Sequence, residues 1–134
     1  MIYLVDANVL SEPTKAAPSA KVVTWLRQNE PELVVDPIIL GEIRFRIHLL
    51  PPGKRRRRLE QWFRHGVLNI ACLPWLAETA LRWAQLLADL RGAHKAMPIK
   101  DSLIAATALV HDLVVVTRDV HFRDAGVKLL DPFA

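Results

Sequence analysis

The sequence predicts an α/β protein with a central, mainly parallel sheet. Short apolar runs at 2–5, 33–35 and 113–116 are rich in β-branched residues and apolar at every position, which is typical of strands buried on both faces. Longer segments with apolar residues at helical spacing separate these runs. Because strands and helices alternate, we expect helices to cover both faces of the sheet in an α/β/α sandwich.

The turn and cap residues between the apolar stretches mark where the elements begin and end. The expected strands cover 2–5, 33–35, 69–73 (at an edge), 113–116 and 127–130. A helical turn is expected over 8–13, and longer helices over 18–29, 37–50, 54–65, 74–91 and 99–111. Asn8 suits the cap of the first turn, and Asp36 followed by Pro37 suits the start of the helix after the second strand.

Two of these helices should be buried in different ways. The helix over 99–111 is apolar almost all round, so we expect it to be buried on most sides. The helix over 74–91 carries a single apolar stripe that should face the core. That stripe consists of Leu76, Ala80, Trp83, Leu87 and Leu90.

Length and composition indicate an ordinary globular protein. The 134 residues suit one domain over 1–134, and a 51% hydrophobic content suits a packed core. We see no signal peptide and no apolar run of about 20 residues, which favours a cytoplasmic protein with no membrane partner. Cys72 is the only cysteine and stands among apolar residues, so we expect a buried structural thiol.

Four acidic residues stand at positions that a parallel sheet would bring to one edge. Asp6 directly follows the first strand and Asp119 comes soon after the strand at 113–116, whereas Glu42 and Asp101 lie near helix starts. Ligands collect at the carboxyl edge of open α/β sheets. Clustered carboxylates raise one another's pKa, and Mg²⁺ or Mn²⁺ would offset that penalty. We therefore expect a metal site that activates water for phosphodiester hydrolysis.

Each acid taken singly also fits a structural role, as a cap, a turn residue or a solvated helix residue. The strand that ends in Asp6 and Asn8 also loosely resembles the nucleophile motif of haloacid-dehalogenase phosphatases. In that motif a second aspartate carries a proton, which Asn8 cannot do. The metal-site prediction therefore depends on the joint placement of the four acids.

The positive charge is concentrated in one segment. The formal net charge is +4, and five consecutive basic residues fill 54–58. Such a run favours nucleic acid as a partner, because neutralising phosphates releases counterions. From charge alone, a solvated helix face is the stronger interpretation. The candidate RNA-binding residues are Lys54, Arg55, Arg56, Arg57 and Arg58.

Four stretches together resemble PIN-domain ribonucleases, above all the VapC and FitB group of toxins from prokaryotic toxin–antitoxin pairs. These stretches are LVDANVLSE, LGEI, IKDSLIAATALVHDLVVVTRD and LLDPF, and they span nearly the whole chain. The resemblance implies a Rossmann-like α/β/α sandwich with an acidic metal site. It also implies a Mg²⁺- or Mn²⁺-dependent endoribonuclease acting as a toxin.

The resemblance assigns roles to individual residues. Asp6 and Asp101 match the main metal ligands, and Glu42 matches a ligand that binds directly or through water. Asp119 matches a second-metal ligand or an outer residue that orients the others. Asn8 and Thr117 also match the family pattern. Their expected role is to hold carboxylates or waters in place.

One stretch departs from the family pattern. Many of these toxins have Thr-Arg-Asn, two variable residues and then Asp-Phe, whereas this chain has TRDVHF over 117–122. The acid therefore stands earlier, as Asp119, and His121 takes the later place. We expect His121 to be a packing or rim residue.

The family resemblance also implies partners. They are a cognate antitoxin that places a basic side chain in the acidic pocket, an RNA substrate, a second copy of the chain in a homodimer, and operator DNA bound through the antitoxin. The alternative function is a non-catalytic PIN-like module that acts by binding an antitoxin or nucleic acid. Metal dependence separates the two, because a pure binding module should tolerate loss of the acids.

Overall fold

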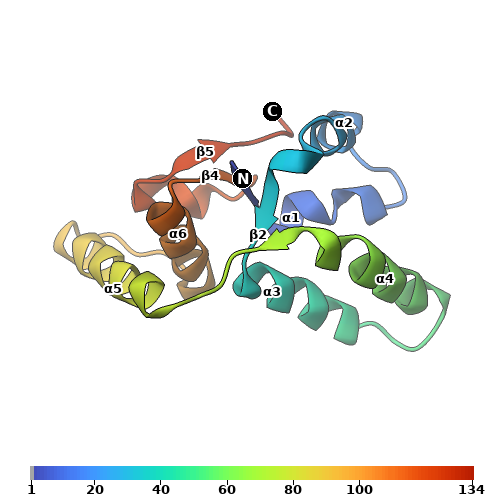
Figure 1. Cartoon of the computed structure of the whole chain (residues 1–134), viewed down its shortest axis with the longest axis horizontal. Helices are drawn as coiled ribbons and strands as arrows, with labels where there is room; N and C mark the ends of the chain where they lie inside the picture. The colour runs from blue at the N-terminus through green and yellow to red at the C-terminus, as the bar shows by residue number, and fades with distance from the viewer. Residues whose placement is uncertain (1) are drawn as a thin grey trace.

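The structure is a computed structural model that describes residues 2–134. Over these residues five parallel strands form one sheet in the order β3-β2-β1-β4-β5 (Figure 1). The strands are β1 (Tyr3–Val5), β2 (Leu33–Val35), β3 (Ala71–Cys72), β4 (Val114–Val116) and β5 (Lys128–Leu130). From β1 the chain builds outward to β3 and then returns to add β4 on the other side of β1. The carboxyl ends of β1 and β4 therefore flank the point where the strand order reverses, which is where ligands bind in open α/β sheets.

Helices flank the sheet and form the α/β/α sandwich that the sequence predicts. The α-helices are α1 (Ala7–Leu10), α2 (Ala20–Gln28), α3 (Pro37–His48), α4 (Lys54–His65), α5 (Ala77–Gly92) and α6 (Ile99–His111). Short 3₁₀ helices are η1 (Glu12–Thr14), η2 (Glu30–Glu32), η3 (Val67–Asn69) and η4 (Val120–Ala125). Helix α5 packs along α6, and α4 packs along α3 (Figure 1). No helix within 2–134 is long and apolar enough to cross a membrane.

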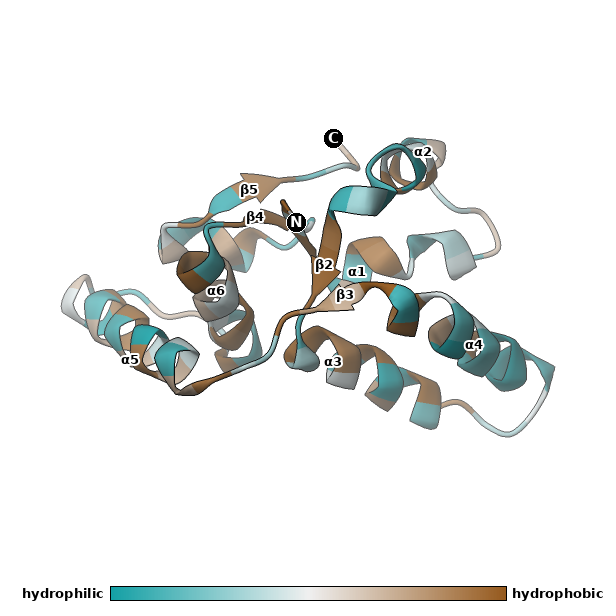
Figure 2. Ribbon diagram, viewed as in Figure 1, coloured by the Kyte–Doolittle hydropathy of each residue, from teal (hydrophilic) through white to brown (hydrophobic). Residues whose placement is uncertain are grey.

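The three central strands and α6 form the middle of the core. Figure 2 shows apolar residues along these strands and over much of α6. Leu4 of β1 pairs with Val34 of β2 and Val115 of β4, and all three side chains are fully buried. Burying a side chain of this kind contributes about 1.5–3 kcal/mol. Helix α6 is buried on most sides, as predicted, so the residues at its start are held firmly.

The first helix begins earlier than the sequence suggests. The cap is Asp6 rather than the predicted Asn8, and the Asp6 side chain accepts the Ala7 N–H. Asp6 has the extended backbone that a cap requires because the chain enters the helix directly from β1. The cap at Asp36 is as predicted, since its side chain accepts the Ile39 N–H at 2.9 Å. Both caps lie at carboxyl ends of strands.

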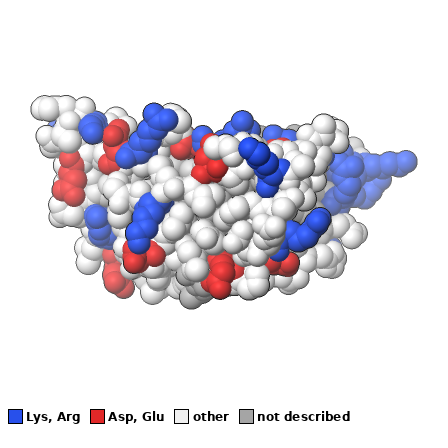
Figure 3. All heavy atoms as spheres, turned by 90° about the horizontal axis from the view of Figure 1, so that it is seen from above, with Lys and Arg blue, Asp and Glu red and all other residues white. Residues whose placement is uncertain are grey.

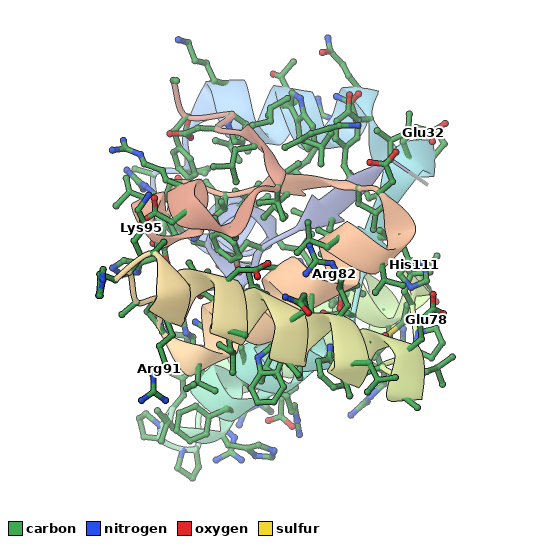
Figure 4. All side chains as sticks on the ribbon, turned by 90° about the vertical axis from the view of Figure 1, so that its left-hand side faces the viewer. Glu32, Glu78, Arg82, Arg91, Lys95 and His111 are labelled. Atoms are coloured by element: carbon green, nitrogen blue, oxygen red, sulfur yellow. The ribbon has the colours of Figure 1, made fainter. Side chains whose placement is uncertain are left out.

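The buried stripe of α5 differs from the predicted one. Thr79, Leu86 and Leu90 are buried, whereas Leu76 is exposed. Leu76 precedes the helix and has an extended backbone, so it lies off the helical stripe. In Figure 4, α5 lies in front of α6, with Arg91 pointing away from the molecule. The packing on α6 therefore uses a face slightly rotated from the one that apolar spacing selects.

The prediction of a buried Cys72 is wrong. Both residues of β3 are exposed, because this short edge strand pairs with β2 alone. The segment expected as a strand over 69–73 begins inside η3, which ends at Asn69, and only two of its residues form β3. Partial burial, aided by the charge of Asp36, raises the pKa of the Cys72 thiol. A raised pKa lowers the thiolate fraction, so exposure does not make this cysteine unusually reactive.

Candidate active site

Asp6 and Thr117 meet where β1 and β4 end. Asp6 is 3% exposed; its Oδ1 accepts the Ala7 N–H at 2.8 Å, and its Oδ2 accepts the Thr117 hydroxyl at 2.8 Å. The pairing of β1 with β4 places these two side chains side by side. Burial raises the pKa of Asp6, and the two hydrogen bonds oppose that rise. The carboxylate is thus fixed in orientation at the end of a central strand.

The Thr117 hydroxyl joins the end of β4 to the start of α1. Besides donating to Asp6, its Oγ1 accepts Asn8 Nδ2–H at 3.1 Å and the Asp119 backbone N–H at 3.0 Å. Asn8 also accepts the Arg118 N–H on its Oδ1 at 3.3 Å. Asn8 and Thr117 therefore hold the segment after β4 against the start of α1, which fixes where Asp119 lies.

Asp101, Asp119 and His121 form the tightest group of potential metal-binding side chains in the described part of the chain. Each offers a ligand atom, and the three atoms lie within 4.8 Å of one another. His121 Nδ1 is 2.9 Å from Asp119 Oδ1 and 3.4 Å from Asp101 Oδ2. The His121 side chain is about half exposed, so it stands at the rim and faces the two acids. The sequence predicts the rim position but not this orientation.

Of the four acids, Asp101 has the environment that most favours a bound cation. It is 2% exposed, and burial, with the charge of Asp119 adding to it, raises its pKa to about 6. Its Oδ1 is buried and accepts no hydrogen bond from residues 2–134. Buried polar atoms nearly always have a partner, so this oxygen is suited to bind an ion. The oxygens of the surrounding acids are donors that Mg²⁺ or Mn²⁺ prefers.

Glu42 completes the acidic set from the second turn of α3. Its side chain is largely buried, and it accepts a hydrogen bond from Lys100, the residue before Asp101 in α6. Lys100 Nζ also lies 4.0 Å from Asp101 Oδ1, and Arg46 approaches the other Glu42 oxygen at 3.6 Å. Burial lowers the pKa of Lys100, but the hydrogen bond to Glu42 and the charges of Glu42, Asp101 and Asp6 together outweigh burial, so the pKa is raised overall.

The structure thus places the four predicted acids along one edge of the sheet. Thr117 links Asp6 to Asp119, His121 links Asp119 to Asp101, and Lys100 links Asp101 to Glu42. Lys100 is not among the residues that the sequence predicts for the site. A cation in the first turn of a helix is disfavoured by the helix dipole, and that anomaly is the signal that could have found it.

A buried bridge behind this edge is also absent from the sequence prediction. Asp36 caps α3, which carries Glu42, and its Oδ2 accepts the Thr107 hydroxyl of α6 at 2.8 Å. Burial raises the pKa of Asp36. The bridge ties together the two helices that present Glu42 and Asp101. The sequence indicates the cap, but not its partner 71 residues away.

The basic run lies at the start of α4, at one end of the molecule. Figure 3 shows basic side chains gathered at the end where Figure 1 places this helix start. Arg56 is bound within the protein: its Nε lies 3.3 Å from Glu60 Oε1, and its Nη1 donates to the Leu50 carbonyl. The other four side chains, which are exposed and form no ion pair within 2–134, are Lys54, Arg55, Arg57 and Arg58.

The fold and site define a parallel α/β protein with an acidic centre at the reversal of strand order. The family model for the PIN domain matches residues 3–128, and the chain belongs to that family. It is 33% identical to VapC ribonuclease Y4jK of Sinorhizobium fredii, covering 98% of each chain. It is also 33% identical to Toxin FitB of Neisseria gonorrhoeae, covering 98% of this chain and 99% of that one. The solved structure of FitAB bound to an IR36 DNA fragment superposes with a TM-score of 0.92 at 30% identity, covering 99% of this chain and 96% of that one.

Proposed function

We propose that this protein is a metal-dependent endoribonuclease that acts as the toxin of a toxin–antitoxin pair. The observation that carries the proposal is the buried Asp101 Oδ1, which has no hydrogen-bond partner in the described chain, although the negative charges of Asp119 and Asp6 act on its carboxylate. Without a cation these acids repel one another. Similarity to a VapC ribonuclease and to Toxin FitB supports the same reaction and the same biological role.

The residues fit a hard divalent cation. Asp6 and Asp101 would be the main ligands, with Glu42 binding directly or through water and Asp119 as a further ligand or an orienting group. Mg²⁺ or Mn²⁺ bound there would supply an activated water and offset negative charge on the phosphodiester. The four carboxylates come from four separate segments, so the fold, rather than any local motif, sets their spacing.

The remaining polar residues hold the acids in place. Thr117 and Asn8 fix the orientation of Asp6 and the position of Asp119 through the hydrogen bonds described above. Groups that orient metal ligands tune affinity and activity although they do not bind the ion. His121, at the rim, faces the buried Asp101 and the partly exposed Asp119.

RNA would be held mainly through its phosphates. The exposed basic residues at the start of α4 supply positive charge without base-specific geometry. Arg118, exposed between Thr117 and Asp119 with its guanidinium over the Phe133 ring at 4.0 Å, offers a further cation. Such an arrangement binds RNA broadly and leaves the choice of cleavage site to the shape around the acids.

We also propose the partners that the relatives suggest. The FitAB structure bound to DNA supports an antitoxin partner through which operator DNA is recognised. A homodimer would cover some of the apolar side chains exposed on the monomer, such as Phe45 and Leu49 on and just after α3.

Cleavage of a structured RNA pool tests the proposal. Wild type and Asp6→Asn are assayed in parallel with Mg²⁺, with Mn²⁺ and with EDTA, after circular dichroism has shown both to be folded. We expect cleavage with metal, none with EDTA, and a loss of at least about 100-fold in Asp6→Asn. Asp124→Asn, which removes an exposed acid paired with Lys95, is the matched control and should cleave like wild type.

Two results would count against this assignment. If folded wild type, free of any copurified partner, cleaves nothing with either metal, the non-catalytic binding module becomes the better description. If cleavage persists equally in Asp6→Asn, then either Asp6 is not in the site or a contaminating nuclease is present. A second purification with Asp101→Asn separates those two explanations.

A further inference from the structure

We propose that Lys100 is a built-in counter-cation of the acidic site, which a divalent ion must displace in order to bind. This inference rests on the proposed metal-dependent function and adds to it a device that limits metal affinity. In this view the ammonium group and the divalent ion compete for the same carboxylates, Glu42 and Asp101. Metal binding then turns the Lys100 side chain outward, toward the solvent side of the site.

The position of the ammonium group carries the proposal. Lys100 Nζ donates to Glu42 Oε1 and lies 4.0 Å from Asp101 Oδ1. These are the largely buried carboxylate of α3 and the buried, unpartnered oxygen of α6. The nitrogen therefore stands between two of the oxygens expected to hold the ion. A divalent cation binds carboxylate oxygens at about 2 Å, and an ammonium group cannot remain beside the same oxygens against the repulsion of two cations.

The other basic side chains near the acids contact different oxygens. Arg46 approaches Glu42 through Oε2, and His121 approaches Asp101 through Oδ2. Neither lies between the two helices as Lys100 does. A metal ion that binds Glu42 Oε1 and Asp101 Oδ1 would therefore displace Lys100 while leaving Arg46 in place.

The position of Lys100 also allows its ammonium group to move away from the acids. It stands in the first turn of α6, and its side chain is 45% exposed. A lysine has a flexible four-carbon stem, so its ammonium group can swing into water while the helix stays fixed. In the metal-free protein the same group offsets part of the repulsion among the acids. In the metal-bound protein it would add positive charge at the edge where an RNA phosphate approaches.

Chemical labelling of wild-type protein tests the displacement directly. A lysine-acetylating reagent is applied with and without Mg²⁺, and modification at each lysine is followed by mass spectrometry. We expect the labelling rate of Lys100 to rise several-fold with Mg²⁺. Lys128, an exposed lysine paired with Asp112 away from the site, is the internal control and should not change. A Lys100 rate that stays the same or falls while Mg²⁺ is bound would overturn the proposal.

Metal binding by two matched variants gives a second test. Lys100→Met and Arg46→Met each remove one cation that contacts Glu42. Mn²⁺ affinity is measured from the electron paramagnetic resonance signal of the free ion. We expect Lys100→Met to tighten Mn²⁺ binding by about tenfold, and Arg46→Met by less than about threefold.

The outcomes separate this inference from the function on which it rests. Equal tightening in the two variants would mean that Lys100 acts only through general charge, and the competition would be refuted. Mn²⁺ binding that is unchanged in Lys100→Met would refute it as well, while leaving the metal-dependent nuclease intact. If neither wild type nor either variant binds Mn²⁺, the proposed metal site itself fails and this inference fails with it.

Discussion

The two charged regions of this protein are built in opposite ways. The acidic site at the ends of β1 and β4 is largely buried, and its side chains are held by specific contacts, such as the Thr117 hydroxyl on Asp6. The basic run at the start of α4 is mostly exposed, and within the described residues Arg56 alone of its five members forms an ion pair. One region fixes geometry, and the other supplies charge.

Both regions oppose the stability of the fold, which separates them from ordinary structural features. Burial of Asp101 raises its pKa, so keeping it ionised costs free energy. Cations in the first turn of α4 face the positive end of the helix dipole, which disfavours them by about 0.3–1 kcal/mol each. Charges that the fold does not need are expected at functional sites. The comparison thus predicts catalysis that depends on fixed side-chain geometry at the acidic site, and salt-sensitive binding at the basic run.

Among the tests of this contrast, loosening the acidic site should have the largest effect. Thr117→Val keeps the size of the side chain but removes the hydroxyl that joins Asp6, Asn8 and Asp119. We expect RNA cleavage to fall by about 10- to 100-fold, because the acids lose their orientation. Initial rates of cleavage with saturating Mg²⁺ measure the effect.

A second buried threonine gives the matched control. Thr107→Val removes a hydroxyl that donates to buried Asp36 at the same 2.8 Å, but behind the site. Both variants should lose stability by about 1–3 kcal/mol, measured by urea unfolding. Cleavage by Thr107→Val should stay closer to wild type. If the two variants lose activity equally, general loosening rather than local orientation explains the effect of Thr117.

A smaller effect should appear in the pH dependence of stability. The pKa of Asp101 is about 6 in the folded protein, above its ordinary value of 3.8, so the folded state binds this proton more tightly than the unfolded state. Stability should therefore fall as pH rises from about 4 to 6, and the loss should be complete above 6. Asp101→Asn should remove a penalty of order 1–3 kcal/mol at pH 7 in metal-free protein.

Urea unfolding in EDTA, from about pH 4.5 to 7.5, measures this difference. The gain in stability of Asp101→Asn over wild type should grow with pH and level off above about 6. Asp112→Asn, which alters a highly exposed acid, should run parallel to wild type. A constant difference between Asp101→Asn and wild type would show that the Asp101 carboxyl does not titrate near 6.

The fold and the acidic site could be predicted from the sequence only in part. The strand ends, the apolar α6 and the placement of Asp6, Glu42, Asp101 and Asp119 follow from hydrophobic runs and parallel topology. The cross-chain partners do not, because nothing local to Asp36 indicates Thr107, or to Glu42 indicates Lys100. The error at Cys72 has a related cause: apolar neighbours suggest burial, but exposure depends on what covers the edge strand.

The smallest effect tests the basic run. Lys54→Glu with Arg57→Glu reverses two exposed charges in the first turn of α4. We expect weaker RNA binding and a salt dependence of log K that is shallower by about 0.7 for each phosphate that is no longer neutralised. Binding is measured across salt concentrations in an Asp6→Asn background, so that cleavage does not interfere. The acids introduced at the helix start should stabilise α4, so weaker binding would not reflect unfolding.

Arg91→Glu, which reverses an exposed charge on α5 (Figure 4), is the control and should leave the salt dependence of RNA binding unchanged. An unchanged slope in the double variant would make the basic run a solvated helix face, and the contrast between the two regions would then be structural only.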